Sequence, residues 1–326
     1  MTDPIRASDT AVTRPTVGTG TAPAVAQPTT EDFEVSLESL NQWQLAWRRF
    51  KRHRLALIGL GVLAVMVSMA ILGPILWPYN PTDIPGVSQP GGDPPTLSPV
   101  RNLFGTDFGG RSVLQFIVVG ARISVAVGFF TSLIATIIGV TIGAIAGYFG
   151  GRVDNLLMRV VDLMLAIPFL FVILVAARFF GGGDPLVLIL IFGLLSWPGL
   201  ARLVRALYLS LRESEFVLAA KAVGVSDLRI TFRHILPNAL GPVVVSSTLI
   251  LANAIVLEAF VSFLNFGIRA TDVSWGNALS NSKGYLLQGN WWWPFFPGMV
   301  LAMTVIAVNF LGDGLRDALD PRSKEV

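Results

Sequence analysis

The chain has 326 residues, of which 53% are hydrophobic and only 14% are charged. Soluble domains carry about 25% charged residues, so the composition excludes a soluble enzyme of this length. The chain has no cysteine, which excludes disulfides and cysteine zinc sites, and its two histidines leave almost no donors for a histidine metal cluster. The composition predicts an integral membrane protein that binds no metal.

Six runs of the sequence are long and apolar enough to cross a bilayer as helices. About 20 helical residues span the hydrocarbon layer, which is about 30 Å thick. The predicted spans are residues 55–77, 123–151, 156–177, 185–201, 240–266 and 291–312. The sequence therefore predicts an all-α, polytopic membrane protein with six transmembrane helices.

The basic residues are divided unequally between the two sides of the predicted membrane segments. If the spans alternate in direction, 18 of the 24 lysines and arginines lie on the side of both termini and six lie on the other. Because basic loops stay in the cytoplasm, both the N- and C-termini are expected to be cytoplasmic. Anionic lipid accounts for the basic clusters, so no nucleic acid partner is expected.

The segments outside the spans differ in composition and give the predicted domain organisation. In chain order, we expect a disordered cytoplasmic tail (1–33), an interfacial amphipathic helix (34–54), the first span (55–77), an external loop (78–121) and a core of five spans (122–321). The tail is rich in Thr, Pro and Ala. In the amphipathic helix, apolar residues recur every three or four positions, a pattern that also fits a soluble partner-binding helix.

Three glycines within the predicted second span are spaced four residues apart. Gly139, Gly143 and Gly147 therefore share one face of the helix, and this face carries no side chains. Such a face lets the backbone of another helix approach closely, so we expect it to pack against a neighbouring helix.

Two acidic residues, Asp162 and Glu258, lie within predicted spans. A charge facing lipid costs about 2.5 kcal/mol or more, so both are expected to face other helices or a translocation pathway. Glu258 could contact a cationic group of a transported solute, or pair structurally with Arg178. Asp162 lies one helical turn after Arg159, and a local ion pair is expected.

Prolines and tryptophans mark further features of the spans. Pro168 in the third span and Pro198 in the fourth interrupt the backbone hydrogen bonds, and an ordinary kink is expected at each. Trp291, Trp292 and Trp293 begin the sixth span. Tryptophans there commonly lie at the membrane–water interface, so we expect an aromatic belt rather than a solute-binding cluster.

The most informative segment follows the fourth span. A helix is expected from Glu215 to about Val223, with Gly224 as its left-handed C-terminal residue. Ser226 can cap a second short helix that has Asp227 in its first turn. Pro237 is expected to end that helix and to open the fifth span. The prediction is a rigid helix–turn–helix projecting from the membrane.

This segment resembles the "EAA" loop of ABC-importer permeases, on the residues Ala219, Ala220, Gly224, Leu236 and Pro237. Leu218 occupies the position of the family's first Glu. The resemblance implies the type I ABC importer permease fold, with a coupling loop at about 205–237 that docks on a cytoplasmic ATPase. The expected ATPase-coupling residues are Glu215, Ala219, Ala220, Gly224, Ser226, Asp227, Leu228, Arg229, Leu236 and Pro237.

Other segments resemble the dipeptide, oligopeptide and nickel branch of the family, in its second permease subunit. They are Phe104-Gly105-Thr106-Asp107 with Gly110-Arg111, Gly120-Ala121-Arg122-Ile123-Ser124, Ser274-Trp275-Gly276, and Gly312-Asp313-Gly314-Leu315-Arg316-Asp317. In the first of these, Ser112 replaces an aspartate of the family pattern. The resemblance implies a bacterial plasma (inner) membrane protein that imports dipeptides or oligopeptides, or alternatively nickel or another small solute.

The chain contains no Gly-Lys pair, so it lacks the phosphate-binding loop that ATP hydrolysis by that motif requires. The resemblance implies a non-catalytic subunit without a cofactor of its own, with ATP and Mg on partner ATPase subunits. The implied partners are a homologous permease subunit, two cytoplasmic ATPase subunits, an external solute-binding protein and the lipid bilayer. The alternative from another class is an ion-coupled secondary transporter, which would transport without ATP.

Overall fold

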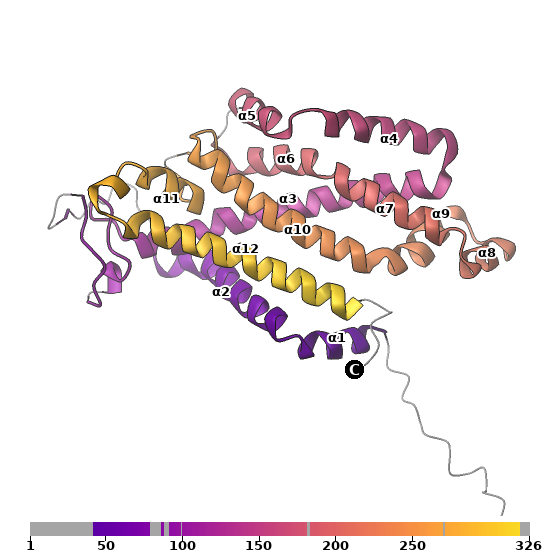
Figure 1. The fold of residues 1–326 in the computed structure, drawn as a ribbon, viewed down its shortest axis with the longest axis horizontal. Coiled ribbons are helices and arrows are strands. Elements are labelled where there is room, and N and C mark those ends of the chain that lie inside the picture. Colours follow the sequence, from indigo (N-terminus) through magenta and orange to yellow (C-terminus); the bar gives the residue numbers. More distant parts are fainter. Residues whose placement is uncertain are drawn as a thin grey trace, which may run out of the picture. The chain divides into compact units, whose positions relative to one another are not determined.

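Long apolar runs form long helices, and helices make up most of the structure (Figure 1). The computed structural model describes residues 42–78, 86–87, 91–98, 100–180, 183–269 and 271–319. The predicted tail, 1–33, and the start of the predicted amphipathic helix lie outside these residues.

The α-helices are α1 (Gln42–Arg52), α2 (Arg54–Leu76), α3 (Val113–Phe149), α4 (Gly151–Ala166), α5 (Phe169–Phe179), α6 (Pro185–Ser196), α7 (Pro198–Leu211), α8 (Glu215–Ala222), α9 (Asp227–Arg229), α10 (Leu236–Phe263), α11 (Trp275–Ser282) and α12 (Trp292–Leu319). Short helical turns are η2 (Val100–Asn102), η3 (Ile230–Ile235) and η4 (Leu286–Gln288).

Five of the described helical segments are long and apolar enough to cross a membrane. They are α2, α3, the α6–α7 pair, the segment from α9 to the end of α10, and α12. Helices α4 and α5 together form a sixth candidate, but the two are bent by 82° at the break between them. The chain is therefore an all-helical protein with five or six candidate spans in the described residues.

The break between α4 and α5 corrects the prediction of an ordinary kink at Pro168. Helix α4 ends at Ala166, and Ile167 adopts an extended conformation, with φ −81° and ψ 136°. The ring of a proline disfavours helical geometry in the residue before it, which explains why the helix stops here. By contrast, α6 and α7 together form one 27-residue segment despite Pro198, in line with an ordinary kink there.

Helix α3 is ten residues longer at its start than the predicted second span. It begins at Val113, and the hydroxyl oxygen of Ser112 accepts a hydrogen bond from the Gln115 N–H at 3.3 Å. The predicted end of the preceding loop at residue 121 is therefore wrong. An N-terminal cap sets the start of this helix, and a search for uncharged residues stops instead at Arg122.

Helix α3 packs against α2, α6, α7 and α10, and its glycine face meets α7. A Cβ atom on Gly143 would lie 2.5 Å from the Ala201 carbonyl oxygen and 2.7 Å from the Val204 Cβ. A Cβ atom on Gly147 would lie 2.7 Å from the Arg205 carbonyl oxygen. The two backbones approach so closely that side chains on this face of α3 do not fit.

Two ion pairs join α4 to α7. Arg205 and Asp154 form a bidentate pair: Nε of the guanidinium donates to Oδ1 of the carboxylate, and Nη2 donates to Oδ2 at 2.7 Å. Arg202 pairs with Asp162. The predicted local partner of Asp162, Arg159, is therefore wrong: the cation comes from the facing helix, which sequence spacing along α4 does not reveal.

The three tryptophans at the start of α12 do not form an aromatic belt. Trp292 and Trp293 are buried, with exposed fractions of 7% and 1%, and only Trp291 is exposed. The Trp292 indole N–H donates to the Thr106 carbonyl oxygen at 3.1 Å, and the Trp293 ring lies 4.7 Å from that of Tyr285. The two buried rings contact Thr106 and Tyr285, which lie in segments between the long helices. A hydropathy pattern does not reveal that these segments cover the tryptophans.

Helix α1 packs against the end of α12. Phe50 is buried beside Ala56 and Ala318. His53 follows α1 and caps α2, its Nδ1 accepting the Ala56 N–H at 3.1 Å. Trp47, whose ring stacks on that of Phe50 with centroids 5.9 Å apart, is 54% exposed.

Candidate functional site

The segment between α7 and α10, residues 212–237, is folded as a compact loop on the end of the helices. Helix α8 ends in a left-handed glycine, Gly224, with φ +80°. The Gly224 N–H donates to the Lys221 carbonyl, and the Val225 N–H donates to the Ala220 carbonyl. This pair of bonds is a Schellman motif, which reverses the chain after the helix. A Cβ on Gly224 would meet nothing within 4 Å, so the backbone angle alone requires glycine.

The second half of the loop continues directly into α10. Ser226 precedes α9, but its side chain makes no capping hydrogen bond. Helix α9 is followed by a π-helical stretch, η3, and Pro237 lies in the first turn of α10. The predicted break at Pro237 is therefore wrong. A proline is tolerated in the first turn of a helix, where its missing N–H costs little.

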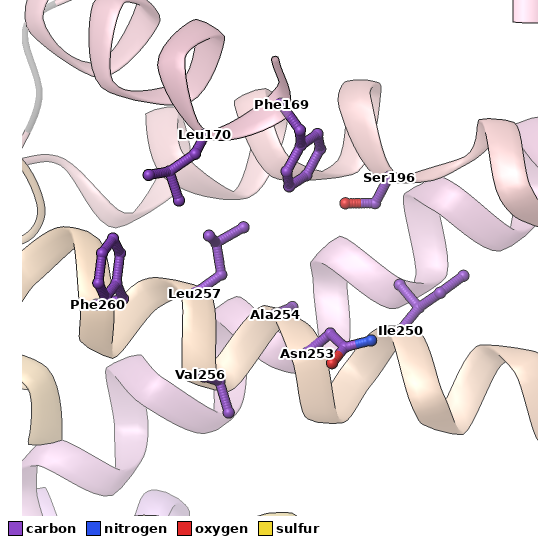
Figure 2. A pocket seen from close by; sticks show the side chains of 9 residues that line it. All are labelled: Phe169, Leu170, Ser196, Ile250, Asn253, Ala254, Val256, Leu257 and Phe260. Atoms are coloured by element: carbon purple, nitrogen blue, oxygen red, sulfur yellow. The ribbon is translucent and has the colours of Figure 1, made fainter. Parts of the chain in front are cut away.

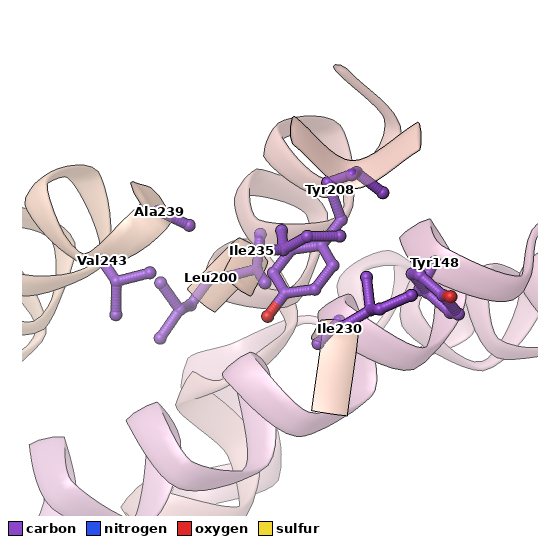
Figure 3. Packing of buried hydrophobic residues seen from close by; sticks show 10 residues of the cluster. Tyr148, Leu200, Tyr208, Ile230, Ile235, Ala239 and Val243 are labelled. Atoms are coloured by element: carbon purple, nitrogen blue, oxygen red, sulfur yellow. The ribbon is translucent and has the colours of Figure 1, made fainter. Parts of the chain in front are cut away.

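The inner side of the loop is anchored by buried apolar residues (Figure 3). Val217, Ile230 and Ile235 are completely buried. They belong to one cluster with residues from the ends of α3, α7 and α10: Ala144, Tyr148, Leu200, Val204, Tyr208, Ala239 and Val243. This packing fixes the loop to three long helices at once.

Two tyrosines add polar contacts to this anchor. The Tyr208 hydroxyl donates to the Thr231 carbonyl oxygen at 3.0 Å, and the Tyr148 hydroxyl donates to Asp227 Oδ1 at 2.5 Å. The Lys221 ammonium lies 5.2 Å from the centre of the Tyr148 ring. Sequence reasoning missed both tyrosines, although the chain has only four, and two of these stand at the ends of spans beside the loop.

The opposite side of the loop, which we call the outer face, is exposed and carries large apolar side chains among charged ones. Val223, Leu228 and Leu218 have exposed fractions of 84%, 69% and 53%. Phe216, Phe232, Glu215, Ala219 and Arg229 are exposed as well, and so is Asp227, although its carboxylate is bonded to Tyr148 of the anchor. Of the remaining predicted coupling residues, Pro237 is exposed, and Ala220 and Leu236 pack against the inner cluster. Exposed apolar side chains of this kind mark surfaces that contact a partner.

Glu258 lies far from this loop along α10 and is completely buried. Its carboxyl oxygens accept hydrogen bonds from the hydroxyls of Ser124 and Ser262, at 3.0 and 2.9 Å. In the part of the chain that the structure describes, neither Arg178 nor another basic side chain forms an ion pair with it. The predicted pairing of Glu258 with Arg178 is therefore wrong, and its place in a translocation pathway stays a prediction.

A cavity of about 490 Å³ lies between α5, α6 and α10 (Figure 2). Its walls are mostly apolar, with Ser196 and Asn253 as the polar side chains. Glu258 does not line it, and Asp162, half exposed beside Arg202, does not line it either. Sequence reasoning missed Asn253, an uncharged polar residue that a search for charges within spans passes over.

Comparison with known proteins now identifies the family. A model described as "Binding-protein-dependent transport system inner membrane component" matches residues 139–325. The chain belongs to this family. A second model, "N-terminal TM domain of oligopeptide transport permease C", matches residues 41–93. Together with the apolar helices, the family makes the chain an integral membrane permease.

Named relatives cover nearly the whole permease. The dipeptide transport system permease protein DppC of Bacillus subtilis (strain 168) is 39% identical over 90% of this chain and 89% of its own length. The oligopeptide transport system permease protein OppC of Haemophilus influenzae is also 39% identical, over 89% of this chain and 92% of its own. A chain of the MetNI methionine ABC transporter, in inward-facing conformations, matches with a TM-score of 0.53 at 19% identity. The match covers 64% of this chain and 98% of the other. It shows the shared fold.

The hydroxyl of Tyr208 gives a test of how the loop of this permease is anchored. Tyr208→Phe is expected to destabilise the loop by about 1 kcal/mol, since one buried hydrogen bond is lost without a change of shape. Faster hydrogen exchange of residues 227–237 would report this. Tyr285→Phe is the control, because Tyr285 packs against Phe108 and Trp293 rather than the loop. Equal exchange in the two variants would contradict the anchoring role.

Proposed function

We propose that this chain is the transmembrane permease subunit of an ATP-driven importer of dipeptides or oligopeptides. The observation that carries the proposal is the construction of the 212–237 loop. One side is buried against α3, α7 and α10, and the outer face presents Val223, Leu228 and Leu218 to a partner. The names of the relatives, which are dipeptide and oligopeptide permeases, support the substrate class.

The proposed partner at the outer face is one of two cytoplasmic ATPase subunits, which bind ATP and Mg. When the ATPases close, the outer face moves with them. Because the loop is anchored on its inner side, this movement reaches the long helices and alternates the access of the pathway. The chain itself performs no covalent chemistry, and its work is a conformational equilibrium biased by its partners.

The proposed topology follows from this docking. The bent α4–α5 pair counts as one span, which gives six, and both termini lie with the 212–237 loop on the cytoplasmic side of a bacterial plasma membrane. The distribution of basic residues supports this orientation. A homologous permease subunit forms the other half of the pathway, and an external solute-binding protein delivers the peptide. The cavity beside Asn253 is the proposed site at which this chain lines the pathway.

Reconstitution tests the proposal. The chain is placed in liposomes with candidate permease, ATPase and binding-protein subunits, and uptake of labelled peptides and of nickel is measured with and without ATP. ATP-dependent peptide uptake, abolished by vanadate, is expected. Uptake by the chain alone without ATP would identify a secondary transporter and overturn the proposal. ATP-dependent uptake of nickel but not of peptides would overturn the substrate class.

A further inference from the structure

The beginning of α11 is seated in a narrow notch between α3 and α10. A Cβ atom on Gly276 would lie 2.9 Å from the Ala259 carbonyl oxygen and 3.0 Å from the Ser262 Cβ. On α3, a Cβ atom on Gly120 would lie 3.2 Å from the Ser274 carbonyl carbon. The notch therefore depends on a glycine at each of its two contacts, with α10 on one side and α3 on the other.

Glu258 lies beside this notch, fully buried, with two serine hydroxyls bonded to its carboxyl group. Ser124 of α3 donates to Oε2 at 3.0 Å, and Ser262 of α10 donates to Oε1 at 2.9 Å. A buried carboxyl group is tolerated only when such donors replace water.

The oxygens of these two serines, and that of Ser274, which precedes α11, each accept one backbone N–H at 3.1 Å. Trp275 N–H donates to Ser124, and Ile268 N–H donates to Ser262. Asn277 N–H donates to Ser274. The backbone N–H groups of Ile268 and Trp275 are thus linked through two hydroxyls to a single carboxyl group.

We propose that Glu258 is a positioning residue that fastens α11 to α3 and α10, so that these three helices move as one body during transport. The role in transport rests on the function proposed above. It also accounts for two sequence segments that the 212–237 loop does not explain. The segment 120–124 supplies one glycine and one serine to the notch, and the segment 274–276 supplies one of each as well.

Glu258→Gln tests the fastening with almost no change of shape. An amide has one acceptor oxygen in place of two, so either Ser124 or Ser262 loses the acceptor for its hydroxyl. The backbone N–H bond that the same serine oxygen accepts is then weakened as well. In the full chain, assembled with its partners in nanodiscs, hydrogen exchange of residues 264–282 is measured. Exchange is expected to be about tenfold faster, the factor for one lost buried hydrogen bond. Ser282→Ala is the matched control, because this buried hydroxyl bonds to Leu279 within α11 itself.

A transport measurement separates positioning from a contribution to folding alone. For Glu258→Gln, peptide uptake per ATP hydrolysed is expected to fall about tenfold. The concentration of loaded binding protein that gives half-maximal uptake is expected to stay unchanged. Ser124→Ala removes one link only, and it replaces Glu258→Gln if that variant does not fold.

The outcomes discriminate clearly. Unchanged hydrogen exchange in Glu258→Gln and in Ser124→Ala would overturn the proposal that Glu258 holds α11, whatever the uptake. Faster exchange with unchanged uptake per ATP would overturn the role in transport. Absence of peptide uptake by the unmodified complex would overturn the proposed function, while the exchange measurement would still decide whether Glu258 holds α11.

Discussion

Replacing Gly224 with valine is expected to reduce ATP-driven peptide uptake about 5- to 30-fold while leaving the chain folded and inserted. At φ +80°, a β-branched residue is strained by roughly 1–2 kcal/mol, which is a factor of about 5–30 in the population of the native turn. Because α8 ends at this turn, a changed backbone angle displaces Val223 and Leu218 of the outer face relative to Leu228. Uptake and ATP hydrolysis of the reconstituted complex measure the effect.

Gly289→Val provides the matched control for this strain. Gly289 has φ +92° and, like Gly224, has no atom within 4 Å of the position of a Cβ. It lies beside η4, far along the chain from the 212–237 loop. The same backbone strain is therefore introduced without touching the outer face. If both variants lose uptake equally, the turn at Gly224 has no special part in coupling.

Replacing Gly143 with leucine is expected to lower the stability of the folded chain, which is the largest effect on stability that we predict. Its Cβ would overlap the Ala201 carbonyl oxygen and the Val204 Cβ, and a backbone atom cannot move aside as a flexible side chain can. Overpacking costs typically 1–3 kcal/mol, and here α3 and α7 must separate along their contact. A lower melting temperature and a loss of monodisperse protein in size-exclusion chromatography are expected.

Gly61→Leu is the control for this substitution. Gly61 also lies in an apolar span, α2, and a Cβ atom there would meet nothing within 4 Å. The two variants therefore add the same side chain to the same class of helix and differ in packing. A melting temperature for Gly143→Leu equal to that of Gly61→Leu would show that the α3–α7 contact is not close-packed in the membrane.

Gly224 and Gly143 also illustrate what sequence reasoning can predict. Gly224 follows an apolar helical pattern and precedes Ser226, so the turn is encoded within a few residues. Gly143 and its neighbours share one helical face by their spacing alone. Such features depend on short-range geometry, and hydropathy located most of the long helices for the same reason.

The predictions that were wrong concern contacts between distant residues. Glu258 was expected to meet a charge, yet its partner Ser124 lies 134 residues away and has an ordinary polar side chain. The cation beside Asp162 comes from Arg202, on a helix whose position against α4 no local pattern specifies. The sharp bend before Pro168 was underestimated because a proline reveals that a helix is interrupted, but not the angle at which the next helix leaves.

The uninterrupted helix from Asp227 to Phe263 has a mechanical consequence. Asp227 borders the proposed ATPase contact, and Glu258, 31 residues later, lies at the proposed attachment of α11 at the far end. At 1.5 Å per residue, the two lie roughly 45 Å apart along one rod. If this rod pivots near its middle like a lever, a tilt of about 10° moves its ends by several ångströms in opposite directions. One stiff helix can thus open one side of the membrane as it closes the other.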